Sequence, residues 1–182
     1  MTVEPTDAEL IEAVQSGRED AFDALMKRYE RFVYKLAYGF GRSHENALDL
    51  SQTVFLKVYR KLDLYRGDSS FKTWLAKVVY NEGVTWQRSN RRHVEGRQEI
   101  EHTAPSRPAP QDDDLLRTQR RTLVLQGLAG LNRRYRAAIE LRYFHGMGLS
   151  EIADVLGCSE GVAKNALFRG VRTLRDRLAG AA

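Results

Sequence analysis

The chain of 182 residues has one cysteine, four prolines and no long apolar run. Its single cysteine, Cys158, cannot form an internal disulfide, and its four histidines do not stand at the spacing of a zinc site. Nowhere do about eighteen uncharged apolar residues follow one another, and no basic stretch leads into an apolar run at the start. These absences predict a cytoplasmic protein with no metal, no cofactor and no contact with a membrane.

Charge, by contrast, is plentiful and unevenly placed. Charged residues make up 29% of the chain, and the net charge is +5 at pH 7. The stretch 4–23 is mainly acidic, whereas arginines gather in one block at 88–97 and in another at 169–177. Because clustered positive charge attracts polyanions, this distribution predicts two separate basic surfaces and a nucleic acid as a partner.

Residues 98–114 interrupt the pattern and divide the chain. They show no apolar periodicity, contain three of the four prolines, and end in the aspartates 112–114. Such a segment cannot bury itself, and it is typical of a linker. The aspartates could form a magnesium site or, as is more usual, a solvated charge run before a helix. The sequence therefore predicts two small domains, 1–97 and 115–182, joined by a flexible linker over 98–114.

Both domains have the periodicity of helices, and no strand alternation is found. Thr6 and Glu9 stand in the order of a capping box, which opens a short helix that Gly17 can end. Three longer helices are predicted at about 22–40, at about 46–62 and from 71 onward. Two more are predicted at 115–131 and 133–144. The fold class is therefore predicted to be all-α.

The C-terminal domain contains the most specific local pattern. Within 149–159, Ile152 and Leu156 face a core, Ala153 leaves room for a crossing helix, and Gly157 supplies a tight turn. A longer amphipathic helix follows at once. This is the arrangement of a helix-turn-helix. The alternative is a solvated basic helix in an ordinary bundle.

The outward face of that longer helix combines positive charge with one amide. Lysine and arginine neutralise phosphates, and an asparagine amide can read the edge of a base in the major groove. The predicted DNA-binding residues are Lys164, Asn165, Phe168, Arg169 and Arg172.

Two stretches of the N-terminal domain, 46–59 (NALDLSQTVFLKVY) and 70–81 (SFKTWLAKVVYN), closely resemble the second conserved region of extracytoplasmic-function sigma factors. The C-terminal half resembles their fourth region. The match covers nearly the whole chain apart from the linker, in the order and spacing of the family. The resemblance implies a sigma subunit of the sigma-70 family, which directs bacterial RNA polymerase to promoters and catalyses nothing itself.

The resemblance also implies protein partners. The helix over 46–62 is similar to the surface that docks on the clamp helices in the largest subunit of core RNA polymerase. The implied polymerase-binding residues are Asp49, Gln52, Leu56 and Lys57. Leu56 and Tyr59 lie off the apolar side of this helix, which suits the core of an interface. The family further implies contact with the flap of the second-largest subunit and allows an inhibitory anti-sigma protein.

Promoter DNA is the other implied partner. The loop from Tyr65 to Ser70 and two positions of the following helix are similar to those that capture an unstacked base of the minus-ten element. Nearby arginines can hold phosphates. The implied minus-ten residues are Tyr65, Ser70, Asn81, Thr85, Arg88, Arg91 and Arg92. Trp74 and Trp86 are each open to two interpretations, a core residue or a DNA contact.

The chain departs from the family where the second helix of the helix-turn-helix begins. Family members usually have Gly-Thr-Val-Lys-Ser-Arg there, and this chain has GVAKNA at 161–166. Because asparagine favours adenine edges, Asn165 is expected to change the preferred minus-thirty-five sequence. Cys158 stands where a cysteine is common in the family, and it is interpreted as a small buried thiol or, alternatively, a redox sensor.

Other functional classes compete with this interpretation. A helix-turn-helix regulator that binds DNA without polymerase would have no use for the docking helix. A helical adaptor would show DNA binding that does not depend on salt. An enzyme is disfavoured, because the sequence contains no nucleophile elbow, no Gly-rich phosphate loop and no paired carboxylates beside a histidine.

Overall fold

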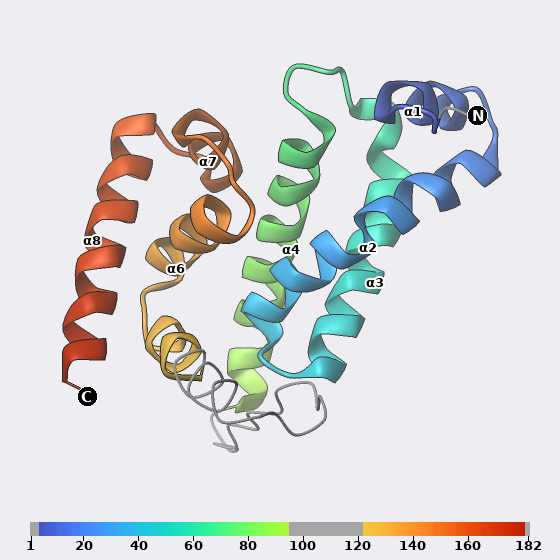
Figure 1. Cartoon of the computed structure of the whole chain (residues 1–182). Helices are drawn as coiled ribbons and strands as arrows, with labels where there is room; N and C mark the ends of the chain where they lie inside the picture. Colours follow the sequence, from blue (N-terminus) through green and yellow to red (C-terminus); the bar gives the residue numbers. More distant parts are fainter. Residues whose placement is uncertain (1–3, 95–121, 181–182) are drawn as a thin grey trace, which may run out of the picture. The chain divides into compact units, whose positions relative to one another are not determined.

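The computed structural model describes residues 4–94 and 122–180, and in this part of the chain the structure is helices, turns and loops without strands (Figure 1). The chain divides into two compact units, Met1–Thr103 and Ala104–Ala182. The predicted all-α class with two small domains is therefore confirmed. The linker predicted at 98–114 lies outside the described residues, so the predicted domain limits stay predictions. No helix among the described residues is long and apolar enough to cross a membrane.

The first unit opens with the predicted capping box. Helix α1, Asp7–Gln15, begins after Thr6, whose side chain accepts a hydrogen bond from the Glu9 amide at 3.3 Å. The Glu9 carboxylate accepts one in return from the Thr6 amide at 2.7 Å. These two bonds satisfy amides that the helix itself leaves without partners, which explains why the helix starts there.

Three longer helices form the body of this unit: α2, Glu19–Gly41; α3, His44–Lys61; and α4, Phe71–Val94. Each of the three contacts the other two. Their buried apolar residues form the core: Leu25, Val33, Leu50, Val54, Val58, Leu75 and Val79. Helix α3 starts two residues before the predicted position because Ser43 caps it, accepting a hydrogen bond from the Asn46 amide at 3.1 Å.

A short connection separates α3 from α4. One 3₁₀ turn, η1 (Leu62–Leu64), follows α3 directly. The loop 65–70 then leads to α4, and the Ser70 hydroxyl accepts a hydrogen bond from the Thr73 amide at 3.2 Å. Ser70 thus acts as a helix cap at the end of the loop that the resemblance assigns to DNA.

The second unit contains the helix-turn-helix. A helix over 122–129 and α6, Arg133–Ile139, precede α7, Leu149–Leu156, and α8, Glu160–Ala179. Gly157 has φ of 61° in the turn between α7 and α8, a left-handed conformation that glycine adopts without a steric penalty. Ile152, Ala153 and Leu156 are buried, as predicted.

Two predictions for this unit are only partly met. The stretch 133–144 is not one α-helix, because α6 is followed by a turn of π-helix, η2 (Glu140–Phe144). After it, the Met147 amide donates to the carbonyl of Leu141 at 3.0 Å. In the helix predicted at 115–131, residues 122–129 are helical, and residues 115–121 lie outside the described residues.

Candidate protein-binding and nucleic-acid interfaces

An apolar groove lies on the outer side of α3. Its volume is about 370 Å³, and it is lined by Phe22 of α2 together with Gln52, Phe55, Leu56 and Tyr59 of α3. The rings of Phe22 and Tyr59 meet edge to face with centroids 5.0 Å apart. Leu56 is 62% exposed and Tyr59 is 50% exposed. Large apolar side chains that stay exposed next to one another mark a protein-binding surface.

The groove contains some of the predicted polymerase-binding residues and adds others. Gln52 and Leu56 line it, whereas Asp49 is exposed but does not. Lys57 forms an ion pair with Glu82 of α4. Phe22 begins the helix predicted at about 22–40, and it is half-buried because it forms the opposite wall of the groove. The sequence placed Tyr59 off the apolar side of its helix, and Tyr59 is the residue whose ring contacts Phe22.

The loop 65–70 is built on aromatic rings. Tyr65 is half-buried and lies edge to face against Phe71 and against Trp74, with centroids 5.6 Å apart in both pairs. Its hydroxyl donates to the carbonyl of Ser69 at 2.8 Å, which closes the loop on itself. Trp74 stacks on Phe71 at 5.7 Å and is itself only half-buried. The structure thus places Tyr65 and Ser70 at the two ends of a short loop and Trp74 beside it.

The predicted residues of α4 share one exposed face. Asn81, Thr85 and Arg88 are exposed and follow one another at steps of four and three residues, which is one side of a helix. The Thr85 hydroxyl donates to the carbonyl of Asn81 at 3.0 Å. The helix continues through Arg91 and Arg92, whose side chains lie outside the described residues. Trp86 is half-buried.

Helix α8 separates a buried face from an exposed polar face. Ala163, Ala166 and Gly170 are buried against the rest of the unit. All five predicted minus-thirty-five residues are exposed: Lys164, Asn165, Phe168, Arg169 and Arg172. Phe168 is 69% exposed, and an aromatic ring in that position suits contact with a partner better than it suits water. Three cations, an amide and a ring on one face match the requirements of a DNA groove.

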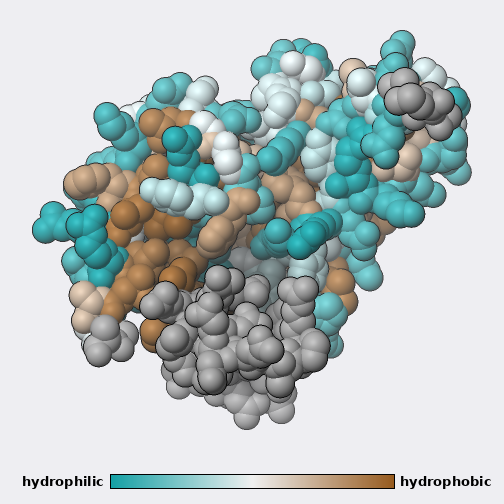
Figure 2. Space-filling view, in the orientation of Figure 1, coloured by the Kyte–Doolittle hydropathy of each residue, from teal (hydrophilic) through white to brown (hydrophobic). Residues whose placement is uncertain are grey.

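Apolar residues are also exposed elsewhere in the second unit. Figure 2 shows hydrophobic residues exposed on one face of this unit. Besides Phe168, the large apolar side chains exposed among its described residues are Leu123, Leu125, Tyr143, Phe144 and Val162. Tyr143 and Phe144 belong to the π-helical turn η2. Such turns are frequent at functional sites, so this part of the unit is a second candidate protein-binding surface.

Metal ligands and the single thiol are the remaining groups with chemistry of their own. Among residues 4–94 and 122–180, no group of three or more His, Cys, Asp or Glu side chains is placed to hold a metal ion. The aspartates 112–114 lie outside these ranges. Cys158 is a free, half-buried thiol.

The family models that match the chain are Sigma-70 region 2, over residues 25–93, and Sigma-70, region 4, over residues 121–174. The RNA polymerase sigma-H factor of Pseudomonas aeruginosa is 30% identical over 183 residues, which is 93% of this chain and 92% of that protein. The ECF RNA polymerase sigma-E factor of Escherichia coli is 28% identical over 186 residues, 98% of this chain and 97% of that protein.

Solved structures agree in fold. CnrH, solved in complex with the cytosolic domain of CnrY, has a TM-score of 0.71 at 24% identity and covers 95% of this chain and 97% of its own. RpoE, solved with the anti-sigma factor NepR from Bartonella quintana, has a TM-score of 0.72 at 23% identity, with 87% and 96% covered. With both conserved regions present in order and relatives matched almost end to end, the chain belongs to the extracytoplasmic-function group of the sigma-70 family and is a sigma factor that directs RNA polymerase to promoters.

Proposed function

We propose that this sigma factor binds the clamp helices in the largest subunit of core RNA polymerase through the groove between α2 and α3. The observation that carries the proposal is the exposure of Leu56 and Tyr59 on a helix whose other side is fully buried. Burial of a Leu and a Tyr side chain in an interface contributes several kcal/mol at about 25 cal/mol per Å² of apolar area. Gln52 supplies a polar group at the same surface.

The same unit reads the minus-ten element in this proposal. Loop 65–70 receives a base that leaves the stack, and Asn81, Thr85 and Arg88 of α4 contact the strand beside it. An extruded base is available only after the duplex opens, so binding it shifts the promoter towards the melted state. The arginines at 91 and 92 extend the same helix towards the phosphates.

Helix α8 reads the minus-thirty-five element from the major groove. Lys164, Arg169 and Arg172 contact phosphates, and Asn165 forms paired hydrogen bonds with an adenine. The exposed ring of Phe168 lies one helical turn from Asn165 and packs on a neighbouring base. The second unit also binds the flap of the second-largest polymerase subunit, with its exposed apolar residues as the contact.

Proteins that bind related sigma factors indicate how this chain could be regulated. RpoE is described in complex with an anti-sigma factor, and CnrH with the cytosolic domain of CnrY. A similar protein could inhibit this chain by covering the groove, because an apolar surface that binds polymerase also suits an inhibitor. The protein acts in the cytoplasm, where polymerase and chromosome meet, and the chemistry of transcription belongs to the core enzyme.

The proposal is tested with purified core bacterial RNA polymerase and run-off transcription from a genomic promoter library. The chain should co-elute with core enzyme and start transcription at a small set of promoters. Gln52→Ala with Leu56→Ala should abolish both. Thr53→Ala is the matched control, because Thr53 is exposed on the same helix but does not line the groove. A chain that ignores core enzyme and binds duplex DNA tightly by itself would instead be an independent regulator.

A further inference from the structure

A series of aromatic contacts connects loop 65–70, which is proposed to capture a base, with helix α2. The ring of Phe71 lies between the loop and the helix. Tyr65 contacts it from the loop at 5.6 Å, Trp74 stacks on it at 5.7 Å, and Tyr29 of α2 meets it edge to face at 5.2 Å. Edge-to-face and stacked ring pairs have defined geometry, so the position of Tyr29 influences that of Tyr65 and Trp74 through Phe71.

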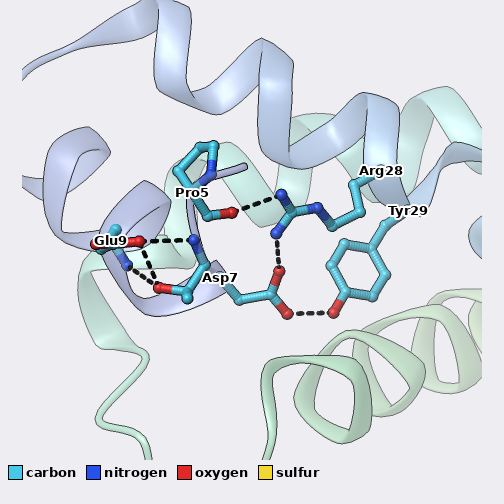
Figure 3. Close-up of polar contacts among 6 residues, drawn as sticks. Pro5, Asp7, Glu9, Arg28 and Tyr29 are labelled. Carbon is cyan, nitrogen blue, oxygen red and sulfur yellow. Dashed lines mark hydrogen bonds and ion pairs between the residues drawn. The ribbon is translucent and has the colours of Figure 1, made fainter. Parts of the chain in front are cut away.

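Tyr29 is in turn held by α1 (Figure 3). Its hydroxyl donates to one carboxylate oxygen of Asp7, and Arg28 donates to the other at 2.6 Å. A second nitrogen of Arg28 donates to the carbonyl of Pro5, also at 2.6 Å. Burial raises the pKa of Tyr29, and the hydrogen bond with Asp7 raises it further, so the phenol remains a donor at neutral pH. Asp7 thereby ties the start of α1 to two neighbouring residues of α2.

The other end of α1 is tied to the start of the loop. The side-chain amide of Gln15 donates to the carbonyl of Leu62 in η1 at 3.1 Å. Tyr65 follows this turn directly, and its amide donates to the same carbonyl of Leu62 at 3.0 Å. Burial raises the pKa of Tyr65, and the negative charges of Asp7 and Asp68 raise it further.

We infer that α1 is a positioning element for minus-ten recognition: Asp7 of α1 holds Tyr29 of α2, and Tyr29 in turn packs against the Phe71 ring that supports Tyr65 and Trp74. This inference rests on the proposed role of loop 65–70. Asp7 and Tyr29 do not touch DNA in this arrangement. They keep the rings of Tyr65 and Trp74 in the geometry that accepts a base. Because the loop is already ordered, binding of the base does not have to overcome the entropy of ordering it.

Tyr29→Phe is the test variant, because it removes one hydroxyl and leaves the ring against Phe71. Holoenzyme is formed with each variant and mixed with a single-stranded oligonucleotide carrying a minus-ten element selected from a random library. The element contains 2-aminopurine at the captured position, whose fluorescence reports the environment of that base. Strand affinity should fall about fivefold, together with the fluorescence change, while affinity for core polymerase stays constant. This is less than the roughly tenfold loss expected for removing a hydrogen bond to a charged group from the binding site itself, because Tyr29 acts on the loop only through Phe71.

Asp7→Ala should give a similar loss, and the double variant should lose no more than the larger single effect, because both changes break the same link. Thr6→Ala with Glu9→Gln is the matched control. It removes the capping box and so destabilises α1 without touching Asp7 or Tyr29. That control should keep most of the strand affinity.

Equal loss in the capping-box control would mean that α1 acts only through general stability, and the inference would fail. It would also fail if Tyr29→Phe captured the base as well as the unchanged chain does. Holoenzyme of the unchanged chain that captures no base would overturn the proposed loop function, and the inference with it.

Discussion

Lys57 of α3 forms an ion pair with Glu82 of α4, whose side chain is only 12% exposed. The resemblance to the sigma family implied that Lys57 contacts polymerase. In the folded chain its ammonium group has a partner on the helix proposed to contact DNA. The pair therefore joins the two helices that the proposal assigns to different partners.

Lys57→Met should destabilise the N-terminal unit by about 1–2 kcal/mol, because it leaves a mostly buried carboxylate without its cation. Glu82→Gln should have a smaller effect, since the Lys57 side chain is 39% exposed and can be hydrated. Urea denaturation followed by tryptophan fluorescence measures this unit by itself, because Trp74 and Trp86 are the two tryptophans of the chain.

The alternative role of Lys57 gives the opposite pattern. If Lys57→Met kept its stability and lost affinity for core polymerase, Lys57 would be an intermolecular contact and not a structural one. The double variant Lys57→Met with Glu82→Leu should recover part of the stability that Lys57→Met loses, because no unpaired charge is then buried.

Gly170→Ala should loosen the packing of α8 on α6. An added Cβ at this position would lie 3.1 Å from the side chain of Ile139 and 3.1 Å from both the Cβ and the backbone oxygen of Tyr135. The backbone oxygen cannot rotate away, so the helices must separate by a few tenths of an ångström. The cost of about 1–2 kcal/mol outweighs the ~0.5–1 kcal/mol that alanine gains over glycine inside a helix. Amide hydrogen exchange along α8 measures the loss directly.

Gly161→Ala on the same helix is the control for that change. A Cβ there would meet nothing within 4 Å, and alanine is about 0.5–1 kcal/mol better than glycine inside a helix. Exchange along α8 should therefore slow or stay the same. Faster exchange in both variants would show that α8 does not depend on close contact at Gly170.

Asn165→Ala should abolish the preference for adenine at one position of the minus-thirty-five element. A paired hydrogen bond between asparagine and adenine is worth about 1–3 kcal/mol of discrimination. Selection of bound sequences from a randomised minus-thirty-five library by the holoenzyme measures the preference. An unchanged selected sequence would remove Asn165 from the base-reading residues.

Arg172→Ala serves as the comparison, because arginine at this position is proposed to contact a phosphate. Its loss should weaken binding by a similar factor for all sequences in the library. It should also reduce the slope of log binding constant against log salt concentration by about one, because one phosphate contact fewer releases about one counterion fewer. A changed base preference would reassign Arg172 to base reading.

Much of the fold could be predicted because a helix and its ends are specified by residues that lie close together in the sequence. The capping box of Thr6 and Glu9, the turn at Gly157 and the exposed face of α8 all depend on residues a few positions apart. The π-helical turn at 140–144 was missed. Over five residues, the spacing of apolar side chains does not distinguish a π-turn from another turn of α-helix.

Sequence by itself determined the helices, their inward faces, the order of the two conserved regions and so the sigma family, because each depends on local spacing or on motif order. Tertiary structure decided which faces meet. It made Phe22 a wall of the groove with Tyr59, gave Lys57 its partner in Glu82, and brought Asp7 to Tyr29. These pairs lie far apart along the chain, and helical periodicity says which side of a helix is buried but not which distant side chain it contacts.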